Sequence, residues 1–169
     1  MARLRAAGIG TLVMLTGDHR DAAHAIARAC GVDEVMAELL PEDKVRAVRS
    51  LEERHGSVAM VGDGVNDAPA LASATVGIAM GAAGSASALE IADIALMGDD
   101  LGRLPYLYAL SRRARSVIRQ NVALSLLIKG ALAVGVPFGV VPLVAAVLLG
   151  DMGVSLAVTL NALRLGRVG

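Results

Sequence analysis

Hydrophobic and polar positions follow two alternating patterns over the first hundred residues. Short, continuous apolar runs are typical of strands buried on both faces of a sheet, and longer amphipathic stretches are typical of helices. The apolar runs are 11–15, 57–62, 76–80 and 94–97, and the helical patterns are 21–30, 42–54, 68–74 and 85–92. Strands and helices that alternate in this way predict a parallel α/β sheet.

The pattern changes after position 100. Residues 101–119 form an arginine-studded helical stretch, which predicts a stalk leading to a membrane. From 122 to 163 the charged residues are Lys129 and Asp151 alone. About 20 apolar residues are needed for each helical crossing, so two membrane helices fit, over about 120–137 and 142–163. They are divided by VPFGVVP, whose prolines and glycine predict a turn.

Arginines flank this apolar part on both sides. Arg112 to Arg119 precede it, Arg164 and Arg167 follow it, and the turn between the helices has no charge. The positive-inside rule therefore predicts that both termini are cytoplasmic, in a protein integral to a plasma or inner membrane. Residues 1–10 lack a sustained apolar core, so we expect insertion to depend on the two later helices.

Composition agrees with a chain that is part soluble and part lipid-exposed. Hydrophobic residues make up 55% of the sequence and the mean hydropathy is +0.61, above the usual range of a soluble domain. The formal net charge is zero, which argues against nucleic acid as a partner. Cys30 is the single cysteine, so an internal disulfide is excluded, and its place in an amphipathic helix predicts a buried side chain.

Candidate chemistry lies where predicted strands end, because ligands of parallel α/β sheets bind at the carboxyl ends of the strands. Thr16, Gly17 and Asp18 directly follow the run at 11–15 and suit the binding of phosphate oxygens. The alternative is that Thr16 or Asp18 merely caps the next helix. Lys44, at the start of the following helix, could offer a positive charge to a phosphoryl group, or could be an ordinary solvated lysine.

A sharper signal is MVGDGVNDAPAL at 60–71. It places Asp63 and Asp67 around a glycine-rich turn, directly after a predicted buried strand. Two carboxylates four residues apart, next to glycines that allow close approach of the backbone, suit a hard cation such as Mg²⁺. An ordinary turn would use only one or two of these residues, so a turn alone does not account for the whole string.

TGD at 16–18, PEDK at 41–44 and MVGDGVNDAPAL at 60–71 resemble, in this order, the P-type ATPases of the haloacid-dehalogenase-like superfamily. The resemblance implies a haloacid-dehalogenase-like, Rossmann-like fold: half of a phosphorylation domain over 1–100, a stalk over 101–119, and two transmembrane helices. The activity it implies is ATP hydrolysis coupled to cation transport, with Mg²⁺ as cofactor.

The resemblance also implies roles for individual residues. Thr16 and Gly17, beside Asp18, would hold the phosphoryl oxygens, and Lys44 would stabilise the charge of an aspartyl phosphate. Asp63 would be the Mg²⁺ ligand. The loop motif is completed by Asn66, near the phosphoryl group, and by Asp67, which would support the loop.

One departure from the family is large. Its phosphorylated aspartate is followed by Lys-Thr-Gly-Thr, and no aspartate in this sequence is followed by Lys-Thr. The domains that bind ATP and the earlier membrane helices are missing as well. We therefore expect the 169 residues alone not to hydrolyse ATP, and to need the missing N-terminal parts of the same pump as partners.

Lys129 and Asp151 are the candidates for the cargo site, since a charge within a membrane costs at least about 2.5 kcal/mol and is functional by default. At 1.5 Å per residue they lie roughly 15 and 20 Å from the flanking arginines, near the midplane, where they could pair. They could also neutralise each other for structural reasons alone. NVALSLLIKG and GDMGVSLAVTLNALRL resemble the last two helices of zinc, cadmium and lead exporters, which implies that Asp151 binds the transported cation and Lys129 is its counter-ion.

The other polar and small residues of these helices are expected to have structural roles. Hydrogen-bonding side chains are expected to hold the helices together, and glycines to allow close packing. They are Asn121, Ser125, Ser155, Thr159 and Asn161, with Gly130, Gly150 and Gly153.

Two other functions are compatible with parts of the pattern. A membrane-anchored phosphatase of the haloacid-dehalogenase type would use Thr16, Lys44 and Asp63, but it needs its own nucleophilic aspartate near the N-terminus. A non-catalytic truncated paralogue could instead bind and regulate a complete pump.

Overall fold

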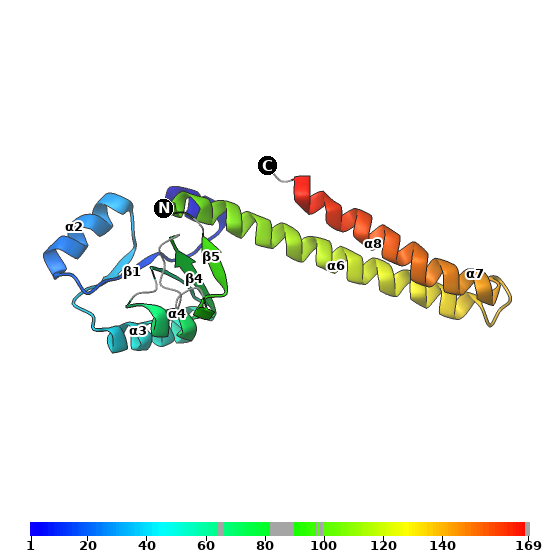
Figure 1. Cartoon of the computed structure of the whole chain (residues 1–169), viewed down its shortest axis with the longest axis horizontal. Helices are drawn as coiled ribbons and strands as arrows, with labels where there is room; N and C mark the ends of the chain where they lie inside the picture. Colours follow the sequence, from blue (N-terminus) through cyan, green and yellow to red (C-terminus); the bar gives the residue numbers. More distant parts are fainter. Residues whose placement is uncertain (64–65, 82–89, 97, 99, 168–169) are drawn as a thin grey trace. The chain divides into compact units, whose positions relative to one another are not determined.

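The computed structural model describes residues 1–63, 66–81, 90–96, 98 and 100–167, and divides into two compact units, 1–104 and 105–169 (Figure 1). The helices of the first unit are α1 (Ala2–Ala7), α2 (Arg20–Cys30), α3 (Pro41–His55) and α4 (Ala68–Ser73). Its strands are β1 (Val13–Leu15), β2 (Glu34–Met36), β3 (Ala59–Gly62), β4 (Val76–Met80) and β5 (Ile94–Leu96). The helix predicted at 85–92 falls mostly outside the described residues.

Every strand pairing in the described residues is parallel, as predicted, but the strands form two sheets and not one. β1 pairs with β2, and a second sheet has the order β3-β4-β5. β2 was missed in the sequence because it is only three residues long and begins with a charged residue, so no apolar run marks it. Each of β1 and β3 therefore has a partner on one side within the described part of the chain.

The two sheets nevertheless share one hydrophobic core. Its buried members are Val48 of α3, Met60 of β3, and Ala70 and Leu71 of α4. Leu15 of β1 packs against this cluster, so side-chain packing connects the first sheet to the second. Burial of such side chains contributes roughly 1.5–3 kcal/mol each. The core therefore fixes where the carboxyl ends of β1 and β3 lie.

α3 begins and ends at residues suited to those positions. Pro41 occupies the first turn, where a missing N–H costs nothing, and the Asp43 carboxylate accepts a hydrogen bond of 3.0 Å from the backbone N–H of Leu40. The helix ends at Gly56, whose φ of 83° is accessible to glycine. α2 ends in the same way at Gly31. Cys30, the last residue of α2, is exposed, so the prediction of a buried thiol was wrong.

The second unit contains two long apolar helical segments. α6 (Leu104–Gly135) follows a 3-10 turn at Leu101–Arg103 and runs without a break, so stalk and first apolar span are one helix. Residues 136–142 make the turn, with Gly139 at a φ of 71°. The return segment consists of α7 (Leu143–Leu148), a π-helical turn at Leu149–Gly153, α8 (Val154–Ala162) and a final 3-10 turn at Leu163–Arg167. By length and composition, Leu101–Gly135 and Leu143–Gly166 could each cross a membrane.

α6 and the return segment pack along a regular seam. The half-buried residues of α6 in this region recur at intervals of four and three, at Asn121, Ser125, Ile128 and Leu132. On the return segment the corresponding positions are Ala146, Gly150, Val154, Val158 and Asn161. Such spacing is typical of antiparallel helices that pack side by side.

Among the glycines predicted to allow close packing, Gly150 does so. A Cβ built on Gly150 would lie 3.2 Å from Leu132 Cδ1, so a larger side chain would push α6 away. A Cβ on Gly130 would meet nothing within 4 Å, and one on Gly153 would meet only Leu149 of its own segment. The packing of α6 against the return segment therefore supports the prediction for Gly150 and leaves it untested for Gly130 and Gly153.

Candidate phosphoryl-transfer and cation sites

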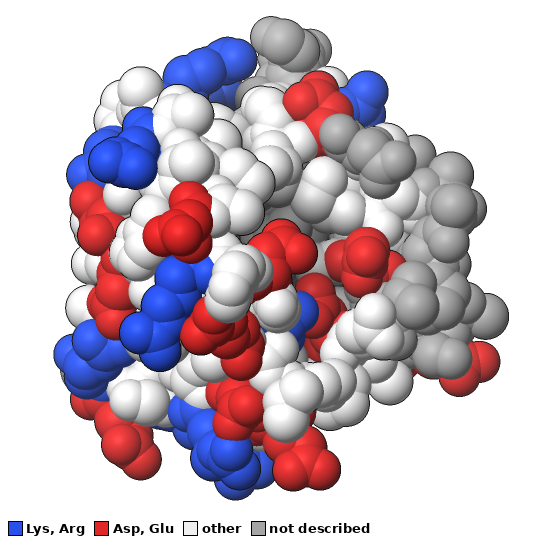
Figure 2. Space-filling model, turned by 90° about the vertical axis from the view of Figure 1, so that its left-hand side faces the viewer, with Lys and Arg blue, Asp and Glu red and all other residues white. Residues whose placement is uncertain are grey.

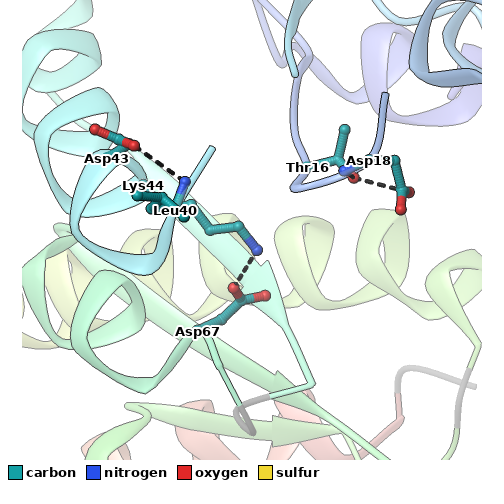
Figure 3. Close-up of polar contacts among 6 residues, drawn as sticks. All are labelled: Thr16, Asp18, Leu40, Asp43, Lys44 and Asp67. Carbon is teal, nitrogen blue, oxygen red and sulfur yellow. Dashed lines mark hydrogen bonds and ion pairs between the residues drawn. The ribbon is translucent and has the colours of Figure 1, made fainter. Parts of the chain in front are cut away.

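Thr16 organises the loop that follows β1. Its hydroxyl accepts a hydrogen bond of 3.1 Å from the backbone N–H of Asp18 and donates one of 2.9 Å to Asp18 Oδ2 (Figure 3). α2 begins only at Arg20, after His19, and neither Thr16 nor Asp18 caps it with a side chain. The helix-capping alternative is therefore wrong, and Thr16 and Asp18 shape the loop itself.

Residues that follow β2 brace this loop. The backbone N–H groups of Glu38 and Leu39 donate to the carbonyls of Asp18 and Thr16, at 3.0 Å each. Gly17 lies so close to this segment that a Cβ there would sit 3.3 Å from the carbonyl oxygen of Leu39. A larger residue at this position would therefore have to push the two loops slightly apart.

Glu38 connects the same two loops through its side chain. It adopts a left-handed backbone conformation with a φ of 60°, and its carboxylate pairs with His19 and Arg20 at the start of α2. Burial raises the pKa of Glu38, but the hydrogen bonds from His19 and Arg20 outweigh it and hold the pKa below its ordinary value. The sequence analysis did not identify Glu38, because a lone glutamate before a helix carries no recognisable signal.

Lys44 and Asp67 form the least exposed ion pair of the described residues. Lys44 Nζ lies 2.6 Å from Asp67 Oδ1, and the two side chains are 14% and 17% exposed (Figure 3). Lys44 belongs to the first turn of α3, and Asp67 directly precedes α4. The alternative of a solvated lysine is therefore wrong. Because Leu39 is bonded to Thr16 and Leu40 starts α3, the Thr16 loop and Lys44 belong to one connected region.

Gly62, the last residue of β3, makes room for this pair. A Cβ at Gly62 would lie 2.9 Å from Asp67 Oδ2 and 3.1 Å from Asp67 Cβ. The carboxylate of Asp67 is therefore held between Lys44 on one side and the backbone of β3 on the other. The role of Gly62 was missed in the sequence, although it belongs to the glycine-rich string at 60–71.

Asp63 and Asn66 differ from Asp67 in being exposed. Asp63 directly follows β3, and residues 64–65 lie outside the described part of the chain. Among the described residues no three His, Cys, Asp or Glu side chains gather to enclose a metal. Mg²⁺ is commonly held by one or two carboxylates with water and phosphate oxygens, so an exposed Asp63 beside a phosphoryl group fits that ion.

Charges of both signs cover the face of the molecule shown in Figure 2. Acidic and basic side chains are interleaved there, in keeping with the zero net charge of the sequence. Among the described residues on that face, no continuous basic patch appears. A site for a phosphoryl group would therefore depend on local groups such as Lys44 and not on a broad positive field.

Lys129 and Asp151 face each other in the second unit. Lys129 Nζ lies 3.9 Å from Asp151 Oδ1, and the side chains are 60% and 80% exposed within the described chain. Asp151 sits in the π-helical turn, a feature often found at functional sites. Both residues border a hollow that is also lined by Leu132, Ala146 and Gly150. The pair thus lies next to the seam between α6 and the return segment, on an exposed side of the two helices.

Polar side chains also join the two helices of the second unit. Asn161 Nδ2 donates to Asn121 Oδ1 at 2.8 Å and to Gln120 Oε1 at 3.3 Å. The prediction that Asn121 and Asn161 hold the helices together is therefore confirmed. Thr159 bonds the carbonyl of Ser155 within its own helix, so for Thr159 that prediction was wrong.

Comparisons with known proteins agree with both units. The family model for haloacid dehalogenase-like hydrolases matches residues 1–75. A probable cadmium-transporting ATPase of Listeria monocytogenes is 51% identical over 167 residues, which cover 98% of this chain and 23% of that protein. A manganese-exporting P-type ATPase of Mycobacterium leprae is 49% identical over 168 residues, which cover 99% of this chain and 23% of that protein.

Among solved structures, a zinc-transporting PIB-type ATPase in its E2.Pi state matches with a TM-score of 0.89 and 47% identity, over 98% of this chain and 27% of that one. The predicted haloacid-dehalogenase-like fold with two apolar helices is thereby confirmed. The chain spans about a quarter of the length of the relatives that it matches. Over nearly its whole length, the chain is similar in sequence and structure to one stretch of P-type ATPases that are named for the transport of metals.

Proposed function

We propose that this chain is part of an ATP-driven exporter of divalent heavy-metal cations. In it, the first unit supplies phosphoryl-binding groups and the second supplies part of the membrane cation site. One observation carries the proposal: the buried Lys44–Asp67 pair next to the Thr16 loop, and the Lys129–Asp151 pair between apolar helices, occur in one chain. Relatives at 47% to 51% identity are named for the transport of metals.

In the first unit, the chain would bind and stabilise a phosphoryl group formed elsewhere in the pump. The backbone N–H of Gly17 and the Thr16 hydroxyl, once turned away from Asp18 Oδ2, would donate to its oxygens, and the ammonium of Lys44 would balance its charge. Asp67 would keep that ammonium oriented. Preorganised donors and charges of this kind are the main contribution of a protein to phosphoryl transfer.

Asp63 would hold Mg²⁺, with Asn66 beside the phosphoryl group. When bound, the ion would neutralise part of the negative charge on the transferred group. Asp63 suits this role because its carboxylate is exposed at the end of β3.

The phosphorylated aspartate and the ATP-binding groups would come from the rest of the pump. β1 and β3 share a core but do not pair with each other in the described structure. A strand supplied by the missing part could pair with both, and would join the two sheets into the single parallel sheet that the sequence predicts. It would also satisfy edge N–H and C=O groups that are otherwise open to association.

In the second unit, Asp151 would provide an oxygen ligand to the transported cation, and Lys129 would act as a counter-ion that competes with it. The high exposure of both side chains leaves the Asp151 carboxylate open to a cation and to ligands from further helices. Zn²⁺, Cd²⁺ and Pb²⁺ remain our proposed cargo. The manganese exporter of Mycobacterium leprae, at 49% identity, adds Mn²⁺ as a candidate.

The helices of the second unit would lie in a plasma or inner membrane, in contact with lipid. Arginines before the first apolar segment and after the second favour cytoplasmic positions for both termini. The first unit would then face ATP in the cytoplasm.

The test is metal-dependent ATPase activity of the intact pump that contains this stretch, with Zn²⁺, Cd²⁺, Pb²⁺, Mn²⁺, Cu⁺ and Co²⁺ tested separately. We expect stimulation by one or more of the first four ions, and its loss in Asp151→Ala. A pump that responds to none of these ions would contradict the proposal. Metal-independent hydrolysis of phosphate esters would instead favour the phosphatase. If the chain, produced on its own, changes the ATPase activity of a separate complete pump, the alternative of a regulatory paralogue is favoured.

A further inference from the structure

The two helices of the second unit are joined by an amide cluster, which consists of Gln120, Asn121, Asn161 and Arg164. Asn161 Nδ2 donates to Asn121 Oδ1 and to Gln120 Oε1, at 2.8 and 3.3 Å. Arg164 donates to Asn161 Oδ1 at 3.3 Å. Asn121 Nδ2 in turn reaches the backbone oxygen of Val158, at 3.5 Å. Both polar ends of the Asn161 amide therefore have partners.

The amide cluster and the Lys129–Asp151 pair belong to the same antiparallel register. Lys129 lies eight residues after Asn121, and Asp151 lies ten residues before Asn161. At 1.5 Å per residue the two intervals differ by about 3 Å. That difference is small enough for the long side chain of Lys129 to span. When Asn121 and Asn161 are paired, Lys129 and Asp151 are consequently brought to nearly the same level.

The rest of the seam specifies this register weakly. Between the two polar pairs it consists of apolar or small side chains, such as Ser125, Ile128, Val154 and Val158. In lipid such surfaces have no hydrophobic drive to associate in one particular alignment. A polar residue in an apolar seam is a well-attested means of fixing register.

We propose that the amide cluster sets the register of α6 and α8 and thereby positions Lys129 opposite Asp151. Asn161 and Asn121 are positioning residues in this scheme, since neither touches the cation. The inference rests on the proposed function, because it assigns the cluster to the cation site described above. Loss of the cluster would let the helices slide or rotate, and the cation would meet a misplaced carboxylate.

The test is Asn161→Leu in the intact pump, with the metal concentration varied. We expect the KM for the metal to rise about 3- to 15-fold, the range that corresponds to one hydrogen bond between membrane helices, while kcat stays within about twofold. Thr159→Val is the matched control, because Thr159 is on the same helix and bonds only to Ser155 of that helix among its hydrogen bonds in the described structure. It should leave both constants unchanged.

A double-mutant cycle separates positioning from a general loss of stability. Asn121→Leu should give the same rise in KM. The double variant should have a KM no higher than that of either single variant, because each of the three variants removes the same Asn161–Asn121 hydrogen bond. Additive effects, or a fall in kcat at constant KM, would overturn the inference. If Asn161→Leu does not fold, Asn161→Ser and Asn161→Gln replace it. The short hydroxyl should raise KM and the longer amide should restore it, and a normal KM in both would also overturn the inference.

Asp151→Asn, measured in parallel, separates this inference from the proposed function. A normal metal KM in Asp151→Asn would overturn the proposed cation site and the inference with it. A raised KM or lost stimulation in Asp151→Asn, together with normal constants in the amide variants, would overturn the inference alone.

Discussion

Lys44 Nζ and Asp67 Oδ1 lie 2.6 Å apart although the two residues are 23 positions apart in the sequence. One comes from the first turn of α3 and the other from the residue that precedes α4. Both side chains are more than four-fifths buried. Removing one partner from such a pair leaves an uncompensated charge, which is more costly than removing both. The pair therefore ties the orientation of the lysine to the loop that follows β3.

Lys44→Met is expected to disable the phosphoryl site. It removes the positive charge that would stabilise the phosphoryl group, and loss of one such electrostatic contact typically lowers kcat about 10²- to 10³-fold. Lys44→Arg should not restore activity, because a guanidinium differs in shape from an ammonium. Metal-stimulated ATPase activity of the intact pump is the measurement. Arg49→Met, an exposed position on α3, is the control, and activity of Lys44→Met within tenfold of wild type would contradict the assignment.

Gly62→Ala is expected to disturb the Lys44–Asp67 pair from the side of β3. The new Cβ would lie 2.9 Å from Asp67 Oδ2, so the carboxylate would have to leave the position in which it pairs with Lys44. Overpacking of this kind costs about 1–3 kcal/mol. The free energy of unfolding, from urea denaturation of the chain, is the measurement. Gly10→Ala is the matched control, because a Cβ at Gly10 would meet nothing within 4 Å. Equal unfolding midpoints for the two variants would show that Asp67 adapts without cost.

Much of the fold follows from short patterns in the sequence, because buried strands and amphipathic helices have distinct periods. The runs at 57–62 and 76–80 correspond to β3 and β4, and the helical pattern at 42–54 lies within α3. The division into two sheets could not be predicted, since the pattern does not specify which strands are neighbours. The π-helical turn around Asp151 was also missed, because its residues continue the apolar pattern of a regular helix.

The candidate site was predictable as a set of residues but not as an arrangement. Glycine-rich strings and a Thr-Gly-Asp turn identify places where backbone can approach a phosphate. They do not show that Lys44 would be paired with Asp67, or that Glu38 would brace the Thr16 loop from a left-handed conformation. Those contacts depend on the packing of elements that are distant in sequence.

The hydrogen bonds of the Asp33 carboxylate make the stability of the first unit depend on pH. The backbone N–H of Leu12 and the guanidinium of Arg5 both donate to its carboxylate, at 2.8 and 2.6 Å, and they hold the pKa of Asp33 below its usual value. Because the pKa is lower in the folded state, Asp33 contributes stability above its unfolded pKa of about 4, and this contribution is lost as the pH falls through the folded value.

Asp33→Asn should therefore lower the thermal midpoint near neutral pH and flatten its dependence on pH below about 4. The measurement is the thermal midpoint of the first unit within the full chain, between about pH 2.5 and 7. Glu53→Gln, which changes an exposed carboxylate on α3, controls for the loss of one negative charge. A parallel decline for wild type and Asp33→Asn on acidification would show that the contacts to Leu12 and Arg5 do not persist in solution.

Gly150→Val is expected to open the helix seam beside the cation site. Gly150 directly precedes Asp151, and even a Cβ at this position would lie 3.2 Å from Leu132 Cδ1. A branched side chain would push α6 away from the return segment and carry Lys129 further from Asp151. The metal KM of the intact pump should rise about tenfold, from strain of about 1–3 kcal/mol at the seam. Gly130→Val, where a Cβ meets nothing within 4 Å in the described structure, should have a much smaller effect. If the two valine variants raise KM equally, the close approach of Leu132 and Gly150 does not shape the site.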